Sequence, residues 1–172
     1  MFKKRVLLID ENDKEMGFAE KLKAHQLGLL HRAFSVFIFN DRGELLLQKR
    51  DQNKYHSAGL WSNTCCSHPV SKNIKKEAEK RLKKEMGIKC PLQQIFSFIY
   101  KAKVGDLIEN ELDYVFVGFY NNKPNLNKKE AVDFAWVDFK SLKSTISQNP
   151  QDYTEWLKLI YEKVFDYGKI KK

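Results

Sequence analysis

Short apolar runs recur along the chain and predict the strands of a sheet. The segment 34–39 is almost wholly apolar and aromatic, which is typical of a strand buried on both faces. Residue types typical of a turn follow at Asn40-Asp41-Arg42-Gly43, so residues 33–49 are predicted to form a hairpin. The predicted strands are 6–10, 34–39, 45–47, 95–103, 107–120 and 135–137.

Helical patterns lie between these strands and after the last of them. Apolar residues at steps of four give one helix face over 73–86, and Gly87 stands where a helix-ending glycine is expected. The other predicted helices are 19–26, 140–147 and 154–165. Because strands and helices alternate, we expect residues 1–172 to form a single α+β domain, an α/β/α sandwich whose mixed sheet packs between helices.

A long polar loop over 51–71 interrupts this alternation. It contains Gly59, Pro69 and several Ser and Asn residues, and a short strand is predicted near Trp61. Long loops inside compact domains are usually functional, so this loop is a candidate part of a site.

Charge and cysteine content narrow the class of protein. The formal net charge of +9 attracts anionic partners, such as phosphorylated metabolites or nucleic acid. No apolar run approaches the length of a membrane span, and the run Val6–Ile9 is too short for a signal peptide, so we expect a cytoplasmic protein. The 3 cysteines, two of them adjacent, indicate thiols rather than a disulfide framework.

Two glutamates lie close together in the predicted strand over 107–120. Glu109 and Glu111 project from the same side of that strand, as does Asp113. Neighbouring carboxylates repel each other unless a cation or a proton lies between them. The alternative is a solvated edge strand, but the apolar continuation over 115–117 indicates a central strand and favours a cation.

Three histidines could complete a metal site with these glutamates. His25, His31 and His68 would add imidazoles to the carboxylates, a mixed set that suits Mn²⁺, Zn²⁺ or Mg²⁺. A histidine taken alone is more often a surface or satisfied core residue, and His56 is interpreted in that way.

Cys66 stands two residues before His68 and would lie beside that centre. A nearby cation lowers the pKa of a thiol and burial raises it, and either change could serve proton transfer. The alternative is that Cys65 and Cys66 are a packed structural pair.

Three segments together resemble the type 1 isopentenyl-diphosphate isomerases. They are Thr64-Cys65-Cys66-Ser67-His68-Pro69, Glu109-Asn110-Glu111, and Ala24-His25 followed by Leu30-His31-Arg32-Ala33-Phe34-Ser35. The resemblance extends from about Lys21 to Trp156 and implies a Nudix-like scaffold. It also implies conversion of isopentenyl diphosphate to dimethylallyl diphosphate through a tertiary carbocation, in isoprenoid biosynthesis.

The resemblance implies a role for each matching residue. Its divalent metal ligands correspond to His25, His31, His68, Glu109 and Glu111. Its catalytic cysteine and glutamate correspond to Cys66 and Glu111, with Tyr100 assisting the glutamate and Trp156 facing the cation. Its diphosphate-binding residues correspond to Lys21, Arg50, Lys54 and Ser67, and the ligand of a Mg²⁺ bound with the diphosphate corresponds to Glu85.

The chain departs from this family's pattern in the long loop. An aromatic-Pro-Gly step is usual there, and this chain has Ser57-Ala58-Gly59. Alanine in place of proline loosens the backbone, which puts the shape of the loop and the placement of Lys54 in doubt.

Two other functions are weighed against the isomerase. In a Nudix hydrolase box ending at Gly87, the glutamate positions fall on Lys72, Arg81, Lys84 and Glu85, so one glutamate of four remains to hold hydrolytic metals. A basic nucleic-acid-binding module would fit the charge, but its basic residues are spread along the chain without a known motif. We therefore expect a small-molecule diphosphate substrate, no nucleic-acid or membrane partner, and a monomer or homodimer.

Overall fold

The computed structural model describes residues 4–54 and 56–169. The nine strands found in these described residues form one sheet. The strands are β1 (Arg5–Ile9), β2 (Glu15–Glu20), β3 (His31–Phe39), β4 (Leu45–Arg50), β5 (Trp61–Ser62), β6 (Cys65–Ser67), β7 (Gln93–Val104), β8 (Leu107–Phe119) and β9 (Ala131–Val137). The helices are α1 (Lys21–Leu27), α2 (Ile74–Met86), α3 (Phe139–Gln148), the short 3₁₀ turn η1 (Pro150–Asp152) and α4 (Glu155–Lys169).

The sheet is mixed, as predicted. β3 pairs in parallel with β8 over its whole length, from His31 opposite Glu111 to Phe39 opposite Phe119. The other ladders between the named strands of the described residues are antiparallel, with β7 beside β8 and β9 beside β4. β8 therefore has a strand on each side, which confirms that the two glutamates lie on a central strand.

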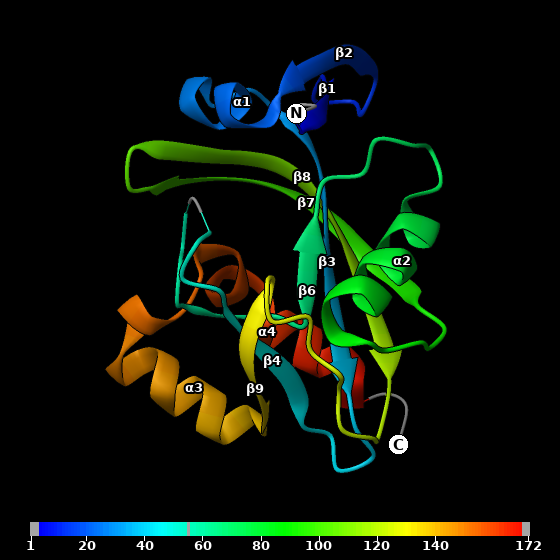
Figure 1. Ribbon diagram of the computed structural model, residues 1–172, viewed down its shortest axis with the longest axis vertical. Coiled ribbons are helices and arrows are strands. Elements are labelled where there is room, and N and C mark those ends of the chain that lie inside the picture. The colour runs from blue at the N-terminus through cyan, green and yellow to red at the C-terminus, as the bar shows by residue number, and fades with distance from the viewer. Residues whose placement is uncertain (1–3, 55, 170–172) are drawn as a thin grey trace.

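Helices cover both faces of the sheet and confirm the α/β/α architecture (Figure 1). On one face, Phe37 and Val115 pack in a core with Leu142 of α3 and Leu157 of α4. On the other face, a second core joins β3, β6 and β8 to α2. Alternate residues of β3 therefore enter different cores, which explains why its sequence is apolar without a break.

One face of β3 and β8 changes from polar to apolar along its length. His31 and Ser35 share a face with Phe37, since strand residues two apart point the same way. On β8 the buried acidic side chains of Glu111 and Asp113 likewise precede Val115 on the same face. The apolar end packs under α3 and α4, and the polar end is left for a site.

The hairpin predicted over 33–49 forms only at its closed end. β3 and β4 pair at Phe39 and Leu45 and then separate, and residues 61–67 enter the gap. The hydroxyl of Thr64 bridges the two separated strands. It donates to the carbonyl of Leu46 on β4 at 2.6 Å and accepts from the amide of Ile38 on β3 at 3.0 Å. The polar loop thus supplies two inner strands, β5 and β6, where a plain hairpin was expected.

Other element boundaries also differ from the prediction. Residues 15–20 form the edge strand β2, so the helix predicted from 19 begins at Lys21. Met16 and Phe18 of β2 are both exposed, so this strand lacks the buried apolar run by which strands were recognised. β9 begins at Ala131, four residues before the predicted start.

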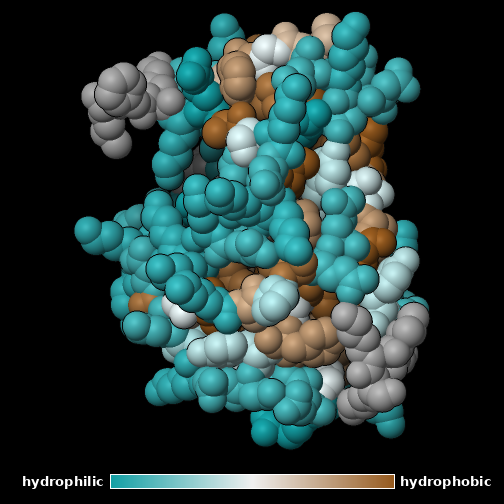
Figure 2. Space-filling model, turned by 90° about the vertical axis from the view of Figure 1, so that its right-hand side faces the viewer, coloured by the Kyte–Doolittle hydropathy of each residue, from teal (hydrophilic) through white to brown (hydrophobic). Residues whose placement is uncertain are grey.

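The outer surface beside α2 is mostly hydrophilic, with small apolar patches between polar side chains (Figure 2). Among the described residues, no helix combines the length and the apolar character needed to cross a membrane.

Candidate active site

A cavity of about 330 Å³ opens at the polar end of β3 and β8. It brings together residues that lie far apart in the sequence. Of the predicted site residues, its lining includes Lys21, Arg50, Lys54, Cys66, Ser67, His68, Glu85, Glu109, Glu111 and Trp156. His25, His31 and Tyr100 stand behind these residues, in contact with the two glutamates.

Three histidines and two glutamates converge beside this cavity. The Nε2 atom of His68 lies 2.7 Å from Oε1 of Glu111, and Nε2 of His31 lies 3.4 Å from the same oxygen. His25 Nε2 lies 3.3 Å from Oε2 of Glu109 and 3.9 Å from Oε1 of Glu111. These are side chains of α1, β3 and β8 and of the segment after β6, so the fold assembles the centre from four places in the chain.

Backbone carbonyls fix which imidazole nitrogen carries the hydrogen. Nδ1 of His25 lies 2.7 Å from the carbonyl of Lys21, and Nδ1 of His31 lies 2.7 Å from that of Leu29. A carbonyl can only accept, so each Nδ1 carries a hydrogen, and in the neutral imidazole each Nε2 presents a lone pair to the centre. Those lone pairs face carboxylate oxygens, which are acceptors too, so the arrangement requires a cation or protons between them. His25, His31, His68 and Glu111 present ligand atoms within 4.8 Å of one another, and His25, His56 and Glu109 form a second such group, so these side chains fit a divalent metal ion.

Glu111 has contacts on both carboxylate oxygens. The hydroxyl of Tyr100 donates to Oε2 at 2.7 Å, while the imidazoles lie at Oε1. Burial disfavours the charged carboxylate, but His68 and His31 hold the pKa of Glu111 well below its usual range. Burial, with Glu111 adding to it, raises the pKa of Tyr100 well above its usual value, so its hydroxyl stays a donor.

Cys66 lies on β6 and reaches the cavity as a protonated thiol. Burial raises its pKa to about 12, although Arg50 acts in the opposite direction. The residue opposite Cys66 on β3 is Ser35, whose hydroxyl donates to Oδ2 of Asp113 at 2.7 Å. Burial and the neighbouring Glu111 raise the pKa of Asp113 well above its usual value, which favours the neutral form of this third acidic side chain.

Cationic side chains line the same cavity. Burial lowers the pKa of Lys21 to about 8, although Cys66 and Glu111 favour its charged form. The guanidinium of Arg50 donates to two loop carbonyls at 3.1 Å each, those of His56 and Ser57. Arg50 thus ties the loop after β4 to the cavity.

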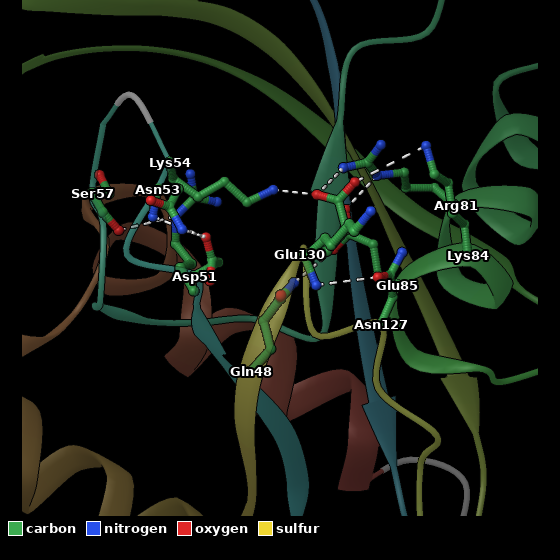
Figure 3. A network of polar contacts seen from close by, with 12 residues as sticks. Gln48, Asp51, Asn53, Lys54, Ser57, Arg81, Lys84, Glu85, Asn127 and Glu130 are labelled. Atoms are coloured by element: carbon green, nitrogen blue, oxygen red, sulfur yellow. Dashed lines mark hydrogen bonds and ion pairs between the residues drawn. The ribbon is translucent and has the colours of Figure 1, made fainter.

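A network of polar contacts joins that loop to α2 (Figure 3). The carboxylate of Glu130 accepts from Lys54 on one side and from Arg81 on the other. Arg81 also donates to Glu85, whose second oxygen accepts from Gln48 at 2.9 Å. Glu85 is 3% exposed and is in neither of the His/Glu groups found among the described residues, so it marks a separate anionic position in the cavity wall.

The indole of Trp156 is held on both its edge and its face. Its Nε1–H donates to Oδ1 of Asn63 at 2.9 Å and to the hydroxyl of Ser62 at 3.1 Å. The guanidinium carbon of Arg50 lies 5.3 Å from the ring centroid. α4 thereby fixes an aromatic ring in the cavity wall.

Comparisons with known proteins agree with this geometry. A protein-family model described as the NUDIX domain matches residues 29–159. Isopentenyl-diphosphate Delta-isomerase 2 of Aromatoleum aromaticum is 47% identical over 93% of this chain and 86% of the relative. Isopentenyl-diphosphate Delta-isomerase of Serratia proteamaculans is 46% identical over 88% of this chain and 86% of the relative. The chain belongs to the isopentenyl-diphosphate Delta-isomerases of the Nudix family.

Solved structures show that this isomerase-family chain has the Nudix fold. DR0079 from Deinococcus radiodurans superposes with a TM-score of 0.75 at 14% identity, covering 92% of this chain and 98% of that one. The MutT protein from Methanosarcina mazei gives 0.65 at 20% identity, covering 83% and 96%. The family resemblance read from the three sequence segments is confirmed.

Three polar residues of this isomerase-family chain were missed in the sequence. His56, interpreted as a surface or satisfied core residue, lines the cavity with its Nε2 atom 3.4 Å from Oε1 of Glu109. Arg81 and Glu130 line the cavity although neither belongs to the three recognised segments. Arg81 could have been found from the sequence, because it precedes Glu85 by four residues and residues four apart share a helix face. Nothing in the sequence pattern pointed to Glu130.

Proposed function

We propose that this chain converts isopentenyl diphosphate to dimethylallyl diphosphate, in keeping with the names of its relatives. The observation that carries the proposal is the gathering of three imidazoles and two carboxylates beside one cavity that also receives a protonated thiol. Double-bond migration by protonation needs an acid and a base at separate carbons, and this cavity offers both.

His25, His31, His68, Glu109 and Glu111 are the proposed ligands of one divalent metal ion, Mn²⁺, Zn²⁺ or Mg²⁺. Bound there, the ion supplies the positive charge that offsets the two buried glutamates. Glu85 is the proposed ligand of a Mg²⁺ that accompanies the substrate diphosphate, supported by its place in the cavity wall.

The acid–base chemistry is assigned to Cys66 and Glu111. One of the pair adds a proton to one carbon of the substrate and forms a tertiary carbocation. The other removes a proton from a different carbon bonded to the cationic carbon, and that C–H electron pair becomes the new double bond. Tyr100 keeps the Glu111 carboxylate oriented through its 2.7 Å hydrogen bond. The face of Trp156 can stabilise the cation without attacking it.

The diphosphate is assigned to the cationic side chains of the cavity. Lys21, Arg50 and Lys54 offer charge, and Ser67 offers a hydroxyl. Lys54 lines the cavity although the loop has Ser57-Ala58 where the family usually has an aromatic-Pro step, which supports its assignment here. Residues 1–172 would act as one domain, as a cytoplasmic monomer or homodimer, without a nucleic-acid partner.

Turnover of the purified full-length chain tests this function. The metal-stripped chain, reloaded with Mg²⁺, Mn²⁺ or Zn²⁺, should interconvert the two diphosphates, followed by separation of the products or by proton NMR. Release of phosphate without isomerisation would indicate a Nudix hydrolase instead. Steep salt-dependent retention of DNA or RNA, with no turnover under any metal, would indicate a nucleic-acid-binding module.

A further inference from the structure

His56 is a fourth histidine at the proposed metal centre. It lies in the loop between β4 and β5, and its Nε2 atom is 3.4 Å from Oε1 of Glu109. Its ring stacks near that of His25, with the two centroids 5.8 Å apart. The family resemblance assigns this residue no role, and the three recognised segments do not contain it.

The loop holds the His56 ring in place from several sides. Arg50 donates to the carbonyls of His56 and Ser57, and Ser57 adopts the left-handed conformation with φ 49°. The imidazole also meets the ring of Trp156 edge-on, at 5.9 Å between centroids. A non-glycine residue in this conformation is uncommon and is kept there by surrounding contacts. The hydrogen bonds from Arg50 and the contact with Trp156 therefore fix the loop backbone and the position of the His56 ring.

The surroundings of His56 differ from those of the other histidines in one decisive respect. Nδ1 of His25 and of His31 each face a backbone carbonyl, which forces the hydrogen onto Nδ1. Nδ1 of His56 instead lies 3.4 Å from the hydroxyl of Ser57, a group that can donate to it. The hydrogen of neutral His56 can therefore sit on Nε2, where it points toward Glu109.

Glu109 has an oxygen that needs this donor. Its Oε2 atom lies 3.3 Å from His25 Nε2, on the side of the proposed metal. Its Oε1 atom is buried and, among the described residues, has no hydrogen-bond partner within standard geometry. A buried carboxylate oxygen without a donor is costly, and Nε2 of His56, 3.4 Å away, could supply one.

We propose that His56 is a positioning residue of the metal centre, donating an Nε2–H hydrogen bond to Oε1 of Glu109 and so orienting Oε2 toward the metal. Groups that hydrogen-bond to metal ligands set their orientation, and losing one typically weakens metal binding by about 10- to 100-fold. The proposal rests on the metal centre of the proposed function, but it needs no turnover to test.

Metal affinity of His56 variants tests the proposal. The apo full-length chain is titrated with Mn²⁺, and free Mn²⁺ is followed by electron paramagnetic resonance. His56→Ala should raise the dissociation constant about 10- to 100-fold. His56→Gln places an amide donor near the position of Nε2 and should keep the affinity within about threefold of the wild type. Gln52→Ala, an exposed change in the same loop, is the matched control.

Each result has one meaning. Wild-type affinity in His56→Ala would overturn the proposal. Equal losses in the Ala and Gln variants would also overturn it, because they would make His56 a direct ligand rather than a donor. Circular dichroism of each apo variant separates these results from unfolding. If the chain binds Mn²⁺ as predicted but does not isomerise the diphosphate, the proposed function fails while this inference stands.

Discussion

At the scale of single residues, Glu111 combines contacts that serve two purposes. Its Oε1 faces His31 and His68, as a metal ligand would, and its Oε2 accepts from Tyr100. Substituting Glu111 would therefore disturb the proposed metal and the acid–base step together. A substitution of Tyr100 separates the two roles better, because its hydroxyl contacts Oε2 of Glu111 while the imidazoles contact Oε1.

Tyr100→Phe should reduce kcat by roughly ten- to hundredfold while leaving Mn²⁺ affinity near that of the wild type. The reason is the loss of one hydrogen bond to a charged carboxylate, worth about 1.5–3 kcal/mol. Steady-state isomerisation assays measure kcat, and Mn²⁺ titration measures affinity. Tyr153→Phe removes a hydroxyl that donates to Thr145, outside the cavity, and is the control. Unchanged kcat in Tyr100→Phe would exclude Tyr100 from the acid–base step.

At the scale of elements, the end of α2 determines where Arg81 and Glu85 lie. Gly87 ends this helix with φ 69°, and a Cβ at that position would lie 2.7 Å from the carbonyl oxygen of Asn125. Asn127 then donates its amide to the carbonyl of Glu85 at 2.8 Å. The chain after β8 is thus packed directly onto the helix that carries the Glu85 position.

Gly87→Ala should lower the free energy of unfolding by more than Gly105→Ala does. Gly105 also has positive φ, 61°, but a Cβ there meets nothing within 4 Å. Left-handed strain of about 1–2 kcal/mol is common to both variants, so the difference isolates the clash with Asn125. Chemical denaturation measures both. Equal losses would mean that the segment around Asn125 yields without cost.

At the scale of the whole molecule, the features that could be predicted are those that depend on the periodicity of apolar and polar residues along the chain. The long buried strands, α2 with its terminal glycine, and the pairing of Glu109 with Glu111 all follow from periodicity. The separation of β3 from β4 could not be predicted, because it depends on Thr64 bonding to both strands across the gap. His56 was missed for a similar reason, since only the folded loop brings it to Glu109.

Cys66 is proposed to act in proton transfer within this Nudix isomerase cavity. Isomerisation of isopentenyl diphosphate by Cys66→Ala, compared with Cys90→Ala, is the decisive test of that role. Cys90 lies outside the cavity lining, so its variant should keep wild-type turnover. Cys66→Ala should lose about 10²- to 10⁴-fold in kcat, the usual contribution of a general acid or base, with the fold and Mn²⁺ affinity retained. Near wild-type turnover in Cys66→Ala would contradict the account.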